Sequence, residues 1–223
     1  MIKAIFFDLD NTLYDQASYF ASGFDVIAKY LNKNLSLLKE DVIEYLNKRL
    51  KAEGSMYTKL FDDLLNFFSV YDEQLVKILV RLFHEAPVDS LVVYDDVRNI
   101  LPQLAHKHLL GLITNGCAAM QRRKVVALGL SGVLSIQVYT AEIGYPKPNP
   151  QGYIAALQSA EVRAGESLYV GDNPYVDFAG ARQLGMYTCR LLRGEFKDVN
   201  SNENLVDAEV RSFYELELWL HRL

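Results

Sequence analysis

The sequence contains little cysteine and no long apolar segment. Its only cysteines are Cys117 and Cys189, which form neither a metal-ligand spacing nor a disulfide framework. No apolar run approaches the length of a membrane span, and the N-terminal residues lack the layout of a signal peptide. We therefore expect a protein of the reducing cytoplasm that does not associate with a membrane.

Basic residues are not in excess either. The 223 residues include 23 Lys and Arg against 28 Asp and Glu, which gives a net charge of −5. This balance argues against a dedicated nucleic-acid-binding protein, because such proteins usually present a basic surface. Obvious repeats and low-complexity segments are also absent. Half of the residues are hydrophobic, so the chain can bury a sizeable core, and its length suits one α/β core with an insertion.

Near its N-terminus the sequence has a short apolar run that is followed by two aspartates. Residues 4–7 read Ala-Ile-Phe-Phe and are apolar on both faces, which is typical of a buried parallel strand. Asp8 and Asp10 follow directly, where ligands bind beyond the carboxyl ends of such strands. Two carboxylates so close together call for a positive charge between them. A hard cation with oxygen ligands, most simply Mg²⁺, meets that need, since no His or Cys cluster favours a softer metal.

Four amphipathic stripes then follow without an intervening strand. They lie at Phe20–Leu31, Leu38–Leu50, Leu60–Phe68 and Leu75–Phe83. Ser36 is a candidate N-cap for the second helix, and Gly54 and Pro87 end the second and fourth. Consecutive helices of this kind predict a separate helical bundle, which we assign to residues 15–87.

The remaining residues, 1–14 and 88–223, alternate between strand and helix patterns. Further strands are expected at 109–113, 136–139, 168–170 and 186–191, and a last helix at 214–220. Strands that alternate with helices predict a parallel sheet. The fold class is therefore α/β, with a Rossmann-like parallel core and an inserted helical-bundle domain.

Three later motifs accompany Asp8-Leu9-Asp10-Asn11-Thr12. They are Thr114-Asn115-Gly116, the lone Lys147 between two prolines, and the segment from Gly171-Asp172 to Asp177. Each alone is a weak signal. All four together, in this order and with three of them at strand ends, resemble the motifs of the haloacid dehalogenase-like hydrolase superfamily, and the resemblance covers nearly the whole chain.

The resemblance implies a phosphatase that forms an aspartyl-phosphate. Asp8 would be the nucleophile, and Asp10 would protonate the leaving alcohol and then activate water. Mg²⁺ would bind Asp8, the backbone carbonyl of Asp10, and Asp172, with Thr12 in a supporting position. In the family, a helical cap above the mouth of the active site is inserted where residues 15–87 lie.

The other motif residues would handle the phosphate. Thr114 offers a hydroxyl, while Asn115 and Gly116 offer backbone N–H donors. Lys147 would supply a fixed positive charge for the nucleophile and the phosphate. Asp177 would hold Lys147 or a metal-bound water, although an Asp stabilised by a helix N-terminus is almost as good an interpretation.

Several alternatives stay open at this level. The family's dehalogenases lack an acid at the position of Asp10, so this residue favours phosphate chemistry. A phosphosugar mutase keeps both acids. A phospho-accepting receiver-like module also uses an Asp, a Thr and a Lys with Mg²⁺, but it would lack the helical insertion. The expected substrate is a small phosphorylated metabolite of the sugar phosphate or nucleotide monophosphate class, and the sequence leaves the oligomeric state open.

One further cluster receives a simpler interpretation. Arg122, Arg123 and Lys124 form a basic run inside a predicted helix. Because lysine and arginine are mostly exposed, we expect this run to form a solvated face.

Overall fold

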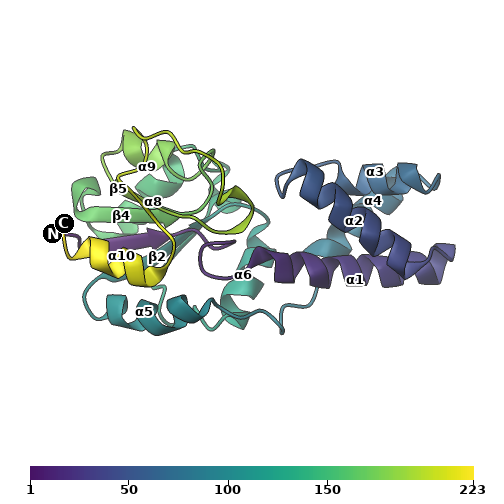
Figure 1. Ribbon diagram of the computed structural model, residues 1–223, viewed down its shortest axis with the longest axis horizontal. Helices are drawn as coiled ribbons and strands as arrows, with labels where there is room; N and C mark the ends of the chain where they lie inside the picture. Colours follow the sequence, from purple (N-terminus) through teal and green to yellow (C-terminus); the bar gives the residue numbers. More distant parts are fainter. The chain divides into compact units, whose positions relative to one another are not determined.

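A computed structural model describes residues 1–223, and the chain divides into two compact units. One unit joins Met1–Gln16 to Leu91–Leu223, and the other comprises Ala17–Ser90. All strands belong to the first unit, whereas the second is built from helices (Figure 1).

The first unit is organised around a six-stranded sheet in which every pair of neighbours is parallel. The spatial order is β3-β2-β1-β4-β5-β6, so β1 lies between β2 and β4. The strands are β1 (Ala4–Phe7), β2 (Leu109–Thr114), β3 (Ile136–Tyr139), β4 (Ser167–Gly171), β5 (Tyr187–Leu191) and β6 (Ala208–Val210). This arrangement confirms the predicted α/β Rossmann-like class.

Helices cover both faces of this sheet. They are α5 (Asp95–Ala105), α6 (Ala118–Ala127), α7 (Thr140–Ile143), α8 (Gln151–Ala160), α9 (Ala179–Gln183) and α10 (Phe213–Leu220), with short 3-10 turns η1 (Ala164–Glu166) and η2 (Gly194–Phe196). In Figure 1, α8 and α9 lie on one side of the strands, and α5 and α10 on the other. α7 has no counterpart among the predicted helices, because four residues are too few to show a helical period.

Two consecutive residues of β1 show why its apolar run is unbroken. Phe6 belongs to a buried cluster with Tyr153 of α8 and Phe178 before α9. Phe7 points to the opposite face, where its ring stacks on Phe213 of α10 with centroids 5.5 Å apart. A strand that is covered on both faces needs apolar side chains at every position. β1 is accordingly buried along its whole length.

The second unit is a bundle formed by α1 (Gln16–Leu35, whose first residue belongs to the first unit), α2 (Lys39–Glu53), α3 (Leu60–Phe67) and α4 (Glu73–His84). Its core is formed by the predicted leucine and phenylalanine stripes. The fully buried members include Phe24, Ile27, Leu31, Val42, Leu46, Leu64, Leu65 and Leu79. α4 begins at a true N-cap, since the Asp72 carboxylate accepts a 2.8 Å hydrogen bond from the backbone N–H of Leu75.

The prediction that Ser36 caps the second helix is wrong. Ser36 follows the last residue of α1 and has a left-handed backbone with φ of 57°. Its N–H donates to the carbonyl of Asn32, so the residue ends α1 instead of starting α2. The N-cap of α2 is Leu38, which has no side-chain cap. A polar residue between two helices can serve either one, and its backbone conformation decides which.

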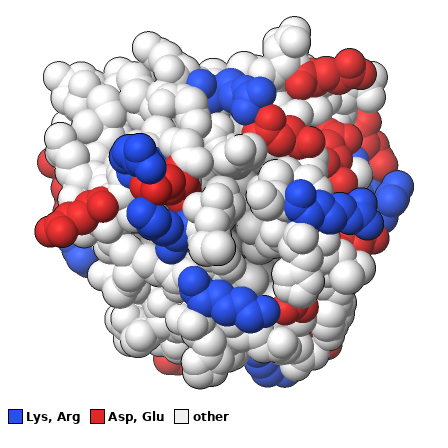
Figure 2. Space-filling model, turned by 90° about the vertical axis from the view of Figure 1, so that its left-hand side faces the viewer, with Lys and Arg blue, Asp and Glu red and all other residues white.

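The surface facing the viewer in Figure 2 mixes both signs of charge. Lys and Arg side chains are spread over that face, and several Asp and Glu side chains gather at its upper right. Both cysteines carry free thiols. No helix combines the length and the apolar character that crossing a membrane requires.

Candidate active site

The motif residues meet because their strands are neighbours. Asp8 follows β1, Thr114 ends β2, and Asp172 follows β4. β1 is parallel to both of the other strands, so all three carboxyl ends lie at one edge of the sheet. Thr114 and Asp172 lie 106 and 164 positions after Asp8 in the sequence, and the order of the strands brings all three together.

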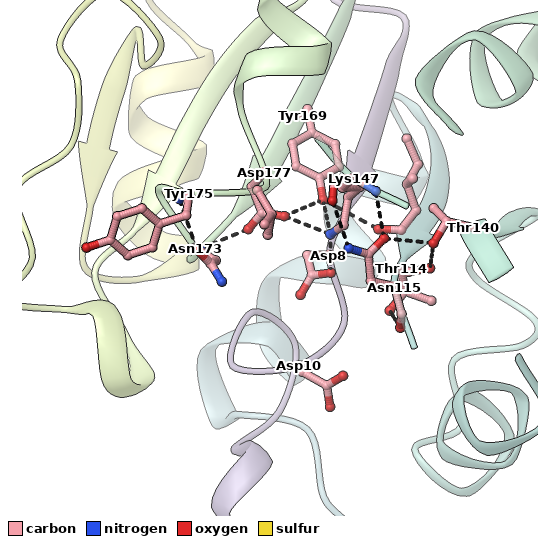
Figure 3. A network of polar contacts seen from close by, with 12 residues as sticks. Asp8, Asp10, Thr114, Asn115, Thr140, Lys147, Tyr169, Asn173, Tyr175 and Asp177 are labelled. Atoms are coloured by element: carbon pink, nitrogen blue, oxygen red, sulfur yellow. Dashed lines mark hydrogen bonds and ion pairs between the residues drawn. The ribbon is translucent and has the colours of Figure 1, made fainter. Parts of the chain in front are cut away.

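Lys147 is the centre of the most buried group of charges. Its Nζ lies 2.5 Å from Asp8 Oδ1, 2.7 Å from Asp177 Oδ1 and 2.8 Å from the hydroxyl of Tyr169, and the residue is only 4% exposed. Figure 3 shows these side chains converging from three elements. Burial lowers the pKa of Lys147, but the carboxylates of Asp177 and Asp8 outweigh that effect and hold it above its ordinary value. The lysine is therefore a permanent cation.

The pKa of Asp8 is also raised, but for a different reason. Burial is the largest influence and raises its pKa to about 7, helped by the nearby charges of Asp177 and Asp10 and opposed by Lys147. One cation thus does not balance the carboxylates that surround it. The site has a deficit of positive charge.

Asn115 holds the loop that carries Lys147. Its side-chain oxygen accepts hydrogen bonds from the Lys147 backbone N–H at 2.9 Å and from the Thr140 hydroxyl at 2.7 Å. Its side-chain nitrogen donates to the Lys147 carbonyl at 3.1 Å. This bridging role of the Asn115 side chain was not among the sequence predictions, which assigned the residue only a backbone donor.

A cluster of carboxylates beside Lys147 is suited to a divalent cation. Oxygens of Asp8, Asp172 and Asp177 lie within 4.8 Å of one another. Asp172 Oδ2 is buried without any hydrogen-bond partner, and burial, followed by the charges of Asp177 and Asp8, raises the pKa of Asp172 well above its ordinary value. A buried carboxylate oxygen without a partner is costly unless a cation or a proton satisfies it. This donor set of hard oxygens fits Mg²⁺.

The Asp177 carboxylate is already engaged by other groups. Its Oδ1 accepts from Lys147 and from the Tyr169 hydroxyl, and its Oδ2 accepts from the Asn173 backbone N–H at 2.8 Å. Gly171 allows this close approach, since a Cβ there would stand 2.4 Å from Asp177 Oδ2. Asp177 is thus occupied as a lysine partner, whereas Asp172 retains a free oxygen.

Asp10 lies in separate surroundings. Its carboxylate accepts from Lys124 Nζ at 2.7 Å, from Gln121 Nε2 at 2.8 Å and from the Tyr14 hydroxyl. In Figure 3 it points away from the contacts around Lys147. Burial raises the pKa of Asp10, but Lys124 and then the hydrogen bonds of Lys124, Tyr14 and Gln121 outweigh it, so the pKa is below its ordinary value. Asp10 is therefore an ionised carboxylate in the resting protein.

The remaining predicted residues line the same edge of the sheet. The Thr114 hydroxyl is buried and accepts from Gln121 Nε2 at 2.7 Å. Gly116 has a φ of 96°, a conformation that glycine adopts at low cost. The Thr12 hydroxyl is buried without a hydrogen-bond partner. The structure brings the predicted site residues to the ends of β1, β2 and β4 and to the loop that carries Lys147.

The expectation that the basic run forms a solvated face is wrong for Lys124. Arg122 is exposed and pairs with Glu142 at 2.7 Å, but the Lys124 side chain is 1% exposed and pairs with Asp10. α6 buries Gln121, Lys124 and Val125, so its helical phase turns Lys124 inward. The sequence does not show this phase, because Val125 and Val126 are both apolar but only Val125 is buried.

Comparison with known proteins points to one family. The model of the family described as "Haloacid dehalogenase-like hydrolase" matches residues 5–191. A protein of Methanocaldococcus jannaschii named glyceraldehyde 3-phosphate phosphatase is 32% identical, over 97% of this chain and 96% of its own. A protein of Methanopyrus kandleri with the same name is 33% identical, over 94% of this chain and 93% of its own.

A solved structure extends this similarity to the fold. The crystal structure of a 2-haloacid dehalogenase from Pseudomonas syringae has a TM-score of 0.70 and 28% identity, covering 100% of this chain and 99% of its own. The resemblance inferred from the four motifs is thereby confirmed. The chain belongs to the haloacid dehalogenase-like hydrolase family.

Proposed function

We propose that this protein is a magnesium-dependent phosphatase that hydrolyses a small phosphomonoester through an aspartyl-phosphate on Asp8. The observation that carries the proposal is the pair of acids at the end of β1. Asp8 lies against the permanent cation Lys147, and Asp10 lies two residues further in a different environment. One acid is thus available for attack and a second for proton transfer.

In the first step, an oxygen of Asp8 attacks phosphorus and the bond to the alcohol oxygen breaks. Asp10 protonates the departing oxygen. Because Asp10 is ionised at rest, it takes up a proton before it donates one, and a phosphomonoester with a second pKa of about 6 can carry that proton into the site. In the second step, Asp10 removes a proton from water, which attacks phosphorus and releases Asp8.

The phosphate is held by the end of β2 and by Lys147. Thr114 offers its hydroxyl, and Asn115 and Gly116 offer backbone N–H groups. Phosphoryl transfer depends chiefly on positioning and on charge stabilisation. The fixed donors would position the phosphate, and the buried cation would stabilise its negative charge. Asn115 contributes a second time, because its side chain fixes the loop that presents Lys147.

Mg²⁺ would be held by Asp8, Asp172 and the backbone carbonyl of Asp10, with Thr12 and Asp177 in supporting positions. When bound, it supplies the positive charge that Lys147 alone does not provide. The partnerless oxygen of Asp172 supports this assignment, and the three donors already on Asp177 support its role as the partner of Lys147.

The proposed substrate is a small phosphorylated metabolite, with glyceraldehyde 3-phosphate as the first to test. Two relatives that match nearly the whole chain carry that activity in their names. Other sugar phosphates and nucleotide monophosphates form the wider class. A phosphosugar mutase would use the same pair of acids and is the second candidate.

We also propose that residues 15–87 act as the family's helical cap and set the substrate preference. The well-formed core of this unit supports the idea that the segment can be exchanged as a block. Replacing it with the equivalent segment of a family member of different specificity should change the substrate profile while hydrolysis of p-nitrophenyl phosphate persists. An unchanged profile in a folded chimaera would contradict a specificity role.

The test is a screen of the purified protein with phosphorylated metabolites, p-nitrophenyl phosphate and a 2-haloacid. We expect release of inorganic phosphate and no release of halide. Conversion of a phosphosugar into its isomer without release of phosphate would indicate the mutase. Halide release without phosphatase activity would contradict the proposal.

Removal of the metal provides the second test. EDTA should abolish phosphate release, and added Mg²⁺ should restore it, because the carboxylates around Lys147 lack sufficient positive charge. Full activity in metal-free buffer would contradict the magnesium assignment.

A further inference from the structure

Lys124 is a buried cation to which the proposed mechanism assigns no role. Its side chain is 1% exposed, and its Nζ lies 2.7 Å from Asp10 Oδ1. Lysine is almost never buried this completely unless it is paired, because removing an ammonium group from water is costly. α6 therefore contributes a lysine that forms an ion pair with the acid that the reaction needs for proton transfer.

Two neutral donors complete the surroundings of Asp10. The buried Tyr14 hydroxyl donates to the same oxygen as Lys124, and Gln121 Nε2 donates to the other oxygen at 2.8 Å. The same Gln121 nitrogen donates to the Thr114 hydroxyl at 2.7 Å. Both carboxylate oxygens of Asp10 thus accept hydrogen bonds from buried side chains. One of these donors, Gln121, also donates to Thr114 at the proposed phosphate-binding end of β2.

We infer that Lys124 is a positioning residue that fixes the Asp10 carboxylate, with Tyr14 and Gln121, for proton transfer to the leaving oxygen and from water. This inference rests on the proposed phosphatase function. Lys124 exchanges no proton in either step. In the first, the Asp8–phosphorus bond forms, the phosphorus–alkoxide bond breaks, and the proton of Asp10 goes to the alkoxide. In the second, water supplies the oxygen that displaces Asp8, and its proton returns to Asp10.

A positioning role has a signature that a merely structural lysine lacks. Proton donation matters most when the leaving oxygen is strongly basic, and it matters little for p-nitrophenolate. If Lys124 acts through Asp10, its loss should reduce kcat/KM for phenyl phosphate much more than for p-nitrophenyl phosphate. KM should change little, because Lys124 pairs with Asp10, and Asp10 is not one of the proposed phosphate-binding groups.

The experiment compares Lys124→Met with Arg122→Met as the matched control. Both residues lie on α6 and both lose an ion pair, but Arg122 is exposed and pairs with Glu142, outside the site. We expect Lys124→Met to lower kcat/KM for phenyl phosphate on the order of 10- to 100-fold, as misplacement of a reacting group does, and to affect p-nitrophenyl phosphate several-fold less. Arg122→Met should match the wild type. Lys124→Arg, which keeps the charge, should recover part of the loss.

If Lys124→Met does not fold, the role of Lys124 can be tested in the Asp10→Asn background. The double variant Asp10→Asn/Lys124→Met removes both charges and leaves none buried alone. If Lys124 acts only through Asp10, the double variant should turn over substrates at the rate of Asp10→Asn alone. A further loss in that background, or an equal loss on both phosphates in the single variant, would overturn the inference. A wild type inactive on every phosphate would instead overturn the proposed function on which it rests.

Discussion

Two buried pairs of aspartate and lysine lie at the end of β1, and they differ in charge balance. Around Lys147, Asp8 and Asp177 share one ammonium group, and Asp172 lies close by. Around Asp10, one carboxylate has Lys124 together with two neutral donors. The pKa of Asp8 is consequently raised to about 7, whereas the pKa of Asp10 is lowered.

This difference shows that an ion pair alone does not determine how an acid behaves. Both aspartates are buried and both contact a lysine. The first belongs to a group with excess negative charge, which suits a metal site and a charged substrate. The second belongs to a balanced group, which suits an acid that must be held in one orientation. Four variants would test this contrast.

The largest effect is expected from Asp8→Asn. This change removes the attacking oxygen, so turnover should fall by about 10⁴-fold or more, as it does when a nucleophile is lost. No covalent phosphoenzyme should form. Intact-protein mass spectrometry after a rapid quench with p-nitrophenyl phosphate measures it, and labelling equal to that of Asp10→Asn would mean that the nucleophile is assigned wrongly.

Asp10→Asn should have the next largest effect and a different character. Loss of general acid and base catalysis should lower kcat by about 10² to 10⁴-fold. Asp8 can still attack a substrate with a good leaving group, but water is no longer activated, so phosphoenzyme should accumulate with p-nitrophenyl phosphate. The same mass spectrometry detects it. Normal turnover by Asp10→Asn would contradict the assignment of Asp10 as the general acid and base. A slow step before phosphorylation, with no accumulated phosphoenzyme, would also contradict the different roles given to Asp8 and Asp10.

Lys147→Met should lower kcat by about 10² to 10³-fold, because it removes one preorganised charge at the reacting group. The variant keeps the length of the side chain but leaves Asp8 and Asp177 without their shared cation. Steady-state kinetics measure the effect, with Lys77→Met as a control, since Lys77 forms an exposed pair with Glu73 on α4. Near-normal kcat would place Lys147 outside the catalytic machinery.

The smallest effect is expected from Tyr169→Phe. The Tyr169 hydroxyl accepts from Lys147 at 2.8 Å and donates to Asp177 at 3.0 Å, inside the buried group. Hydrogen bonds to charged groups contribute about 1.5 to 3 kcal/mol, so the free energy of unfolding should fall by roughly that amount. Urea denaturation measures it against Tyr187→Phe, a partly exposed tyrosine on β5. Equal stability of the two variants would mean that Lys147 and Asp177 do not need the hydroxyl.

Much of the fold was predictable because its signals are local. The apolar run of β1 is short and continuous, and the stripes of the helical unit repeat at helical spacing. The motif residues could be placed together because the carboxyl ends of parallel strands share one edge of a sheet. The end of α1 at Ser36 was not predictable in the same way, because a polar residue between two helices carries no sign of which helix it serves.

The sequence by itself therefore determined the α/β class, the helical insertion and the motif residues at the strand ends. Only the tertiary structure decided how their charges are shared. Asp10 and Lys124 are 114 positions apart, and Lys147 and Asp8 are 139 apart. Arg122 and Lys124 look alike in the sequence, but the phase of α6 exposes the first and buries the second against Asp10. Burial and distance set the strength of a charge interaction, and both depend on packing between distant segments.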